Sequence, residues 1–185
     1  MTIRDPVAVN ISFFLYWGRR FWVPAEWDSL ESLRDADIVR LFLSRYPHRS
    51  VLRWMTREFT PATGLATDIV PFDTTRAAGI FAGGRCSALV LRSDLDDARK
   101  HAEISAFLDA DIPPPHQGNA IGQRLGERHM LHTRLRRVVA GIPGYVDSLI
   151  DDPFTRWFWS AEQRATMRHR WMEVAQDRAT THTHG

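Results

Sequence analysis

The stretch IRDPVAVNIS, residues 3–12, joins the end of a strand to the start of a helix. Asp5 followed by Pro6 is typical of an N-cap and a first helical residue, because Asp accepts free backbone amides and Pro has no amide to leave unpaired. Apolar residues then recur at helical spacing. The sequence therefore predicts a strand ending at residues 3–4 and a helix from Pro6 to about Trp22.

Two polar side chains of this stretch are candidates for holding an anion. Arg4 follows the predicted strand, and Ser12 lies about two turns into the predicted helix. Both can converge on one anion near the helix N-terminus, which carries a partial positive charge. A structural ion pair of Arg4, together with the Asp5 cap, explains the same spacing, so both interpretations stay open at this point.

The sequence patterns on the rest of the chain predict an α/β domain that is rich in helices, with a small mixed or parallel sheet. Residues 87–91, SALVL, form a nearly continuous apolar run, as in a central strand covered on both faces. Short strands are expected at 69–70 and 79–82, with a hairpin at Gly83-Gly84. Helices are expected over residues 28–60 in two or three pieces, 94–108, 123–139 (with Met130 on its buried side) and 160–176.

Composition sets bounds on the class of protein. The chain has 185 residues, enough for one domain with a single core, which we place at 1–175, followed by a flexible polar tail at 176–185. Cys86 is the only cysteine, so the chain has no internal disulfide framework and suits the reducing cytoplasm. No stretch reaches the roughly 20 apolar residues of a membrane span. The sequence thus predicts a cytoplasmic protein without a membrane span.

Three blocks, in the same order along the chain, resemble bacterial sulfotransferases and capsular polysaccharide synthesis proteins. Residues 2–14, TIRDPVAVNISFF, are similar to the 3′-phosphate-binding motif of sulfotransferases that use 3′-phosphoadenosine 5′-phosphosulfate. Residues 54–96, from WMTREF to LVLRSDLD, and residues 142–171, from IPGYVDSL to RATMRHRW, resemble two later blocks of the same family. The resemblance therefore covers nearly the whole chain.

This resemblance implies a P-loop-like sulfotransferase domain that transfers a sulfuryl group from 3′-phosphoadenosine 5′-phosphosulfate to a hydroxyl acceptor, with carbohydrate as one candidate. Arg4 and Ser12 would bind the 3′-phosphate of this donor. Arg124 is a third candidate ligand, with an exposed, solvated arginine as the alternative. Asn10 falls on the motif but is expected to pack or cap, and Val9 stands where the family often has Arg. The resemblance assigns no catalytic residue here and no metal.

In the family, the loop for the 5′-phosphosulfate and the catalytic base come before the Arg-Asp-Pro motif. Only three residues precede Arg4 here. We therefore expect a partial domain, with about half of the cofactor site, that is inactive or incomplete as this chain alone. The alternatives are a non-catalytic remnant, or a subunit completed by another chain as a homo- or hetero-oligomer through an exposed sheet edge.

Two further groups of polar side chains have both a chemical and a structural interpretation. His129 and His132 are three residues apart on a predicted helix, a spacing that can share a metal, but no further His or Cys pattern completes a metal site, which favours surface histidines. The acid cluster at 93–97, SDLDD, invites a paired-carboxylate site. Capping of a helix that starts at Asp94 explains the cluster without catalysis.

A third alternative function is an Arg-rich nucleic-acid-binding protein. Residues 133–139, TRLRRVV, give a basic helical face that could track phosphates, or that could simply be solvated. The net charge of only +2 argues weakly for this class. The tryptophans of the C-terminal block could stack on sugar rings, or could pack under the final helix: Trp157, Trp159 and Trp171.

Overall fold

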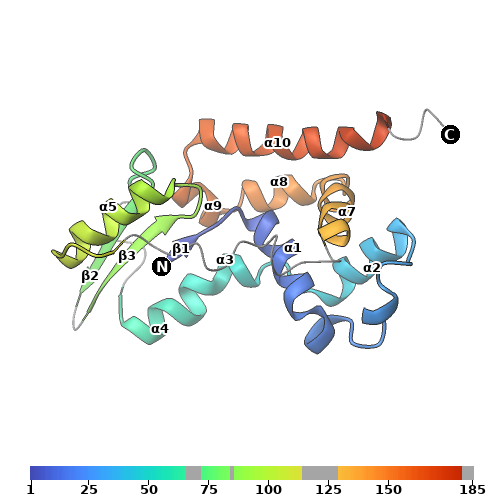
Figure 1. Cartoon of the computed structure of the whole chain (residues 1–185), viewed down its shortest axis with the longest axis horizontal. Helices are drawn as coiled ribbons and strands as arrows, with labels where there is room; N and C mark the ends of the chain where they lie inside the picture. Colours follow the sequence, from blue (N-terminus) through green and yellow to red (C-terminus); the bar gives the residue numbers. More distant parts are fainter. Residues whose placement is uncertain (66–71, 84–85, 114–128, 181–185) are drawn as a thin grey trace.

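The computed structural model describes residues 1–65, 72–83, 86–113 and 129–180, with side chains described up to residue 176 (Figure 1). Its strands are β1 (Thr2–Ile3), β2 (Ala78–Gly83) and β3 (Cys86–Arg92). Its α-helices are α1 (Pro6–Trp17), α2 (Asp35–Arg45), α3 (Ser50–Trp54), α4 (Thr60–Thr63), α5 (Asp97–Leu108), α7 (His129–Ala140), α8 (Tyr145–Ile150), α9 (Pro153–Phe158) and α10 (Ala161–Thr180).

The described strands form a mixed sheet in the order β1-β3-β2. β1 runs parallel to β3, with Thr2 opposite Leu91, and β2 runs antiparallel to β3. This arrangement confirms the helix-rich α/β class, the small mixed sheet and the central position of the SALVL strand. The strand expected at 69–70 lies outside the described residues.

Both faces of β3 are covered, as its apolar run predicts. Val90 faces the main core, where α1, α7 and α8 also bury their apolar residues. Leu89 and Leu91 face the other way, into a smaller cluster against Ile104 and Phe107 of α5. Figure 1 shows the sheet at one end of the molecule, with α1 leading from it to the helices at the other end.

The helix predicted from Pro6 to Trp22 is confirmed, with a change of pitch near its end. Asp5 caps α1 by accepting hydrogen bonds from the amides of Val7 and Ala8. After α1 the chain continues in a π-helical turn over Gly18–Trp22. Glycine is needed at Gly18, because a Cβ there would lie 2.2 Å from the Trp27 ring.

The other helices differ from the sequence expectations at their ends. The helix expected from Asp94 starts at Asp97, because Asp96 is the residue that accepts the Arg99 amide while Asp94 pairs with Arg92. Of the helix expected over 123–139, residues 123–128, and with them Arg124, lie outside the described residues. The rest forms α7, which ends at Ala140.

The final helix begins as expected and ends later than expected. Ser160 and Gln163 exchange the two hydrogen bonds of a capping box, at 3.0 and 3.2 Å. α10 then continues to Thr180, four residues past the expected end at Gln176. The start of the predicted flexible tail is therefore helical, since the chain has no glycine or proline there to stop the helix.

The long helix α10 lies along α7 and α8 (Figure 1). Met167 and Trp171 of α10 are buried in the main core beneath it. None of the helices in the described part of the chain is both long and apolar enough to cross a bilayer.

Candidate anion-binding site

The parallel pairing of β1 and β3 brings their carboxyl ends together. Arg4 follows β1, while Ser93 and Asp94 follow β3, and the Ser93 amide donates to the Ile3 carbonyl at 2.7 Å. Ligands of α/β proteins bind in the crevice outside the carboxyl ends of such strands. The topology therefore places Arg4 where a ligand site is expected.

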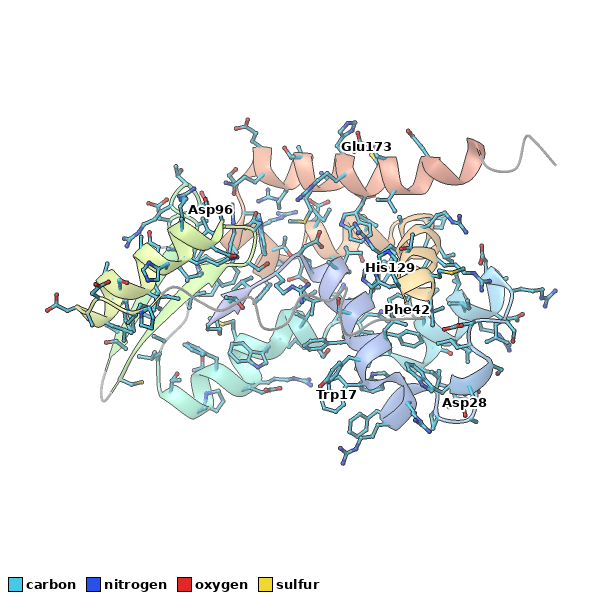
Figure 2. All side chains as sticks on the ribbon, in the orientation of Figure 1. Trp17, Asp28, Phe42, Asp96, His129 and Glu173 are labelled. Atoms are coloured by element: carbon cyan, nitrogen blue, oxygen red, sulfur yellow. The ribbon has the colours of Figure 1, made fainter. Side chains whose placement is uncertain are left out.

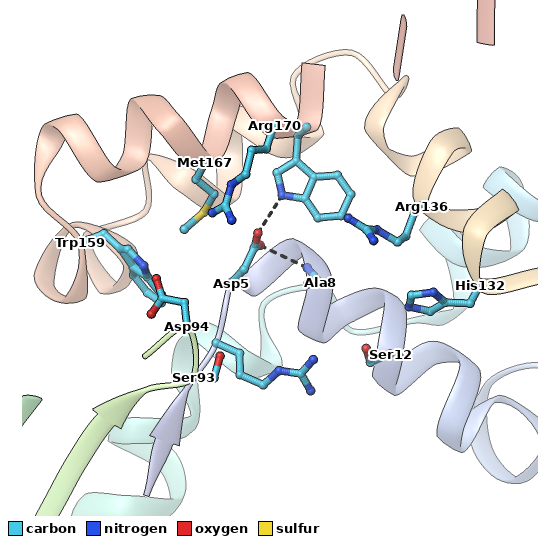
Figure 3. Close-up of a pocket in the computed structure, with 12 residues that line it drawn as sticks. Asp5, Ala8, Ser12, Ser93, Asp94, His132, Arg136, Trp159, Met167 and Arg170 are labelled. Carbon is cyan, nitrogen blue, oxygen red and sulfur yellow. Dashed lines mark hydrogen bonds between the residues drawn. The ribbon is translucent and has the colours of Figure 1, made fainter. Parts of the chain in front are cut away.

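A pocket of about 350 Å³ opens at this position. Figure 3 shows it bounded by α1, by the residues after β3, and by α7 and α10. Its volume is on the scale of small-ligand sites. Its lining residues are Arg4, Asp5, Ala8, Ser12, Ser93, Asp94, His132, Arg136, Trp159, Met167, Arg170 and Trp171. Arg4 and Ser12, which the sequence singled out, thus share one pocket.

The two carboxylates of the pocket are already engaged. One oxygen of Asp5 accepts the amides of Val7 and Ala8, at 2.9 and 3.2 Å. Its other oxygen accepts the indole N–H of Trp171 at 2.8 Å (Figure 3). Asp94 pairs with Arg92 at 3.0 Å. Asp94 is thus paired outside the three pocket arginines, and Asp5 keeps its charge but forms no ion pair with them.

Arg4, Arg136 and Arg170 of the pocket, by contrast, have no acidic partner among the residues that the structure describes. In the described part of the chain, Arg4, Arg136 and Arg170 form no ion pair. On the same two helices, α7 and α10, Arg134 and Arg168 are paired with aspartates. Arg4 therefore forms no structural ion pair with any residue of the described ranges. The pocket has a surplus of positive charge that an anion can balance.

Side chains rather than helix amides supply the donors of this site. The sequence argument placed an anion at the N-terminus of α1, but Asp5 already accepts two of the first amides there. The guanidinium of Arg4 and the hydroxyl of Ser12 remain, and both types of group donate to phosphate or sulfate oxygens.

Asn10 belongs to the core and not to the pocket. Its side chain is fully buried, and its Nδ2 donates to the Tyr145 hydroxyl at 3.0 Å and to the His48 carbonyl at 2.9 Å. The expectation that Asn10 packs is confirmed. Figure 2 shows all the described side chains, including Phe42, whose ring contacts that of Tyr145.

Three residues of the pocket wall were not expected at an anion site: His132, Arg136 and Arg170. His132 had been considered as a metal ligand, but no group of three metal-ligating side chains occurs among the described residues. Arg170 had not been singled out. The helical spacing of Met167, Arg170 and Trp171 places these three residues on one face of α10, and this spacing was the available signal.

The arginines of the basic face predicted at 133–139 make different kinds of contact in the structure. Arg134 pairs with Asp35 at 2.7 Å and donates to the Glu31 carbonyl at 2.8 Å. Arg136 lies over the Trp171 ring, 5.3 Å from its centre, and lines the pocket. Arg134 therefore has a structural contact, while Arg136 faces the pocket. Trp159 and Trp171 are 3% exposed, so they pack in the core.

His132 is the group of the pocket whose protonation is most affected by its surroundings. Burial lowers the pKa of His132 below its usual 6.5, and the positive charges of Arg136, His129 and Arg4 lower this pKa further. His132 is therefore neutral at pH 7, and its protonation is sensitive to any negative charge placed in the pocket.

Comparison of the chain with protein-family models, curated proteins and solved structures finds no match.

Proposed function

We propose that this pocket binds the 3′-phosphate of 3′-phosphoadenosine 5′-phosphosulfate and that the protein is sulfotransferase-like, serving sulfuryl transfer to a hydroxyl acceptor. The observation that carries the proposal is that Arg4, Arg136 and Arg170, none of which has an acidic partner among the described residues, line one pocket together with Ser12. Arg4 and Ser12 are also the residues that the resemblance to sulfotransferases assigns to this phosphate.

The described carboxylates of the pocket suit structural roles rather than proton transfer. Asp5 and Asp94, its carboxylates, already accept hydrogen bonds or pair with arginine. A general base must reach the proton that it removes and must be free to accept it. We therefore assign anchoring of the donor to this pocket, and we assign the activation of the acceptor hydroxyl to none of its residues.

The predicted homo- or hetero-oligomer stays a proposal. β1 stands at one edge of the described sheet, paired with β3 on one side. A second chain that completes the cofactor site would pair at such an edge.

Removal of Arg4 tests the binding proposal. Arg4→Ala is expected to weaken binding of adenosine 3′,5′-bisphosphate, the desulfated donor, by about 10- to 100-fold, because a charge-assisted hydrogen bond to an anion contributes about 1.5–3 kcal/mol. Ser12→Ala loses one neutral donor and is expected to weaken binding by about 3- to 10-fold. Isothermal titration calorimetry measures both affinities.

The matched control is Arg19→Ala, which removes the same charge from an exposed arginine that does not line the pocket. Its affinity should stay within about twofold of the wild type. Equal weakening by Arg4→Ala and Arg19→Ala would show a non-specific charge effect and would contradict a site at Arg4.

A further inference from the structure

His132 lies across the pocket from the α1 side that carries Ser12. Figure 3 shows the His132 ring and the Ser12 side chain facing each other, with Arg136 one helical turn farther along α7. His132 is half-buried, and no hydrogen bond of its ring is formed within the described residues. A proton on this ring would therefore add a donor and a positive charge on the wall opposite Ser12.

The charged groups that face His132 are mostly positive. On α7 itself they are His129 and Arg136, and from the start of α1 comes Arg4. Arg170 lines the same pocket from α10, which packs against α7. These groups disfavour a charged imidazole while the pocket holds no anion.

The acidic groups around α7 do not offset this effect. Asp5, at the start of α1, accepts hydrogen bonds from Trp171 and two amides. Asp35 of α2 is paired with Arg134, and Asp147 of α8 is paired with Arg168. A negative charge that enters the pocket is thus the change that would make protonation of His132 favourable.

We infer that His132 and Arg136 form the far wall of the anion site, so that a dianionic phosphate or sulfate group enters the pocket together with one proton, which His132 takes from the solvent. This inference rests on the proposed function of the pocket, and it adds that binding is linked to protonation. The imidazole nitrogen gains the proton, and the added positive charge pairs with the anion.

The direction of the pH dependence follows from this linkage. In the free protein the pKa of His132 is below 6.5, and a bound dianion raises it. Affinity is therefore highest below the pKa of the free protein. It falls as the pH rises toward the pKa of the complex, and it becomes constant above that value. A rise of about one pH unit in the pKa corresponds to about a 10-fold difference in affinity.

Inorganic sulfate is the probe, because it remains a dianion over the whole range, whereas a phosphate monoester gains a proton near pH 6. We expect wild-type protein to bind sulfate several-fold more tightly at about pH 5.5 than at about pH 8, with the full difference of about 10-fold reached only below the pKa of free His132. His132→Gln should reduce this ratio to about twofold or less. Nuclear magnetic resonance of the imidazole protons measures the pKa of His132 with and without sulfate, and we expect sulfate to raise it.

His169→Gln is the matched control, since His169 is exposed on α10, pairs with Glu173 and lies outside the pocket. It should keep the pH dependence of the wild type. Sulfate binding with the same pH dependence in His132→Gln, or with no change in the His132 pKa, would overturn the linkage while leaving the anion site in place. Absence of sulfate binding to wild type at every pH would overturn both the linkage and the proposed function.

Discussion

Phe14→Ala is expected to lower the free energy of unfolding by about 3–5 kcal/mol, which is the cost of truncating a buried phenylalanine to alanine. Phe14 is fully buried on α1. Its ring meets the Phe42 ring edge-on at 5.2 Å between centres, and the Tyr46 ring at 6.2 Å. Loss of the ring leaves a cavity between α1 and α2 that rigid neighbours fill only in part. Chemical denaturation measures the change.

Phe13→Ala provides the matched control, because it makes the same chemical change at the next residue of the same helix. Phe13 is 46% exposed, so its truncation should cost less than about 1 kcal/mol. Equal losses of stability in Phe14→Ala and Phe13→Ala would mean that α1 does not bury the face that carries Phe14. That result would contradict the packing of α1 on which the core and the pocket depend.

Arg92→Met is expected to lower the free energy of unfolding by about 2–4 kcal/mol, because it removes a buried guanidinium that pairs with the partly exposed Asp94 and leaves its other polar partners unsatisfied. Arg92 is 8% exposed at the end of β3. It pairs with Asp94 at 3.0 Å, donates to the Phe158 carbonyl at 3.4 Å and donates to the Gln163 side chain. It therefore joins the sheet to the start of α10, which carries one wall of the pocket.

The control for Arg92 is Arg40→Met, at an arginine whose side chain is 75% exposed and pairs with Asp37 at 3.4 Å. Exposed pairs of this kind contribute about 0–1 kcal/mol, so Arg40→Met should change stability by less than about 1 kcal/mol. A similarly small loss in Arg92→Met would contradict the role of Arg92 in joining the sheet to α10.

The parts of the fold that depend on neighbouring residues could be predicted from the sequence. The Asp5 cap and the Ser160–Gln163 capping box are local patterns, and the structure has both. The apolar run at 87–91 marks the central strand because burial on both faces requires apolar residues at every position.

Features that depend on distant partners were predicted less well. Asp94 was expected to cap a helix, but it pairs with Arg92, so the helix start moves to Asp97. Met130 was expected to be buried and is 80% exposed, because the buried face of α7 passes through Leu131 and Leu135.

The residues of the candidate site likewise fall into those that a local pattern predicts and those that depend on distant partners. Arg4 and Ser12 could be chosen from one short stretch, because a strand end and the next helix are close in sequence. His132, Arg136 and Arg170 reach the same pocket only through the packing of α7 against α1 and of α10 against α7. No local pattern encodes that packing, so the sequence could not assign these three residues to an anion site.

The central claim is that this pocket recognises the 3′-phosphate of a nucleotide. The most direct measurement compares the affinity of the wild-type protein for adenosine 3′,5′-bisphosphate and for adenosine 5′-monophosphate, which lacks the 3′-phosphate, by isothermal titration calorimetry. We expect the bisphosphate to bind at least about 10-fold more tightly, and we expect Arg4→Ala to remove this preference. Equal affinity for the two nucleotides, or a preference that persists in Arg4→Ala, would contradict the claim.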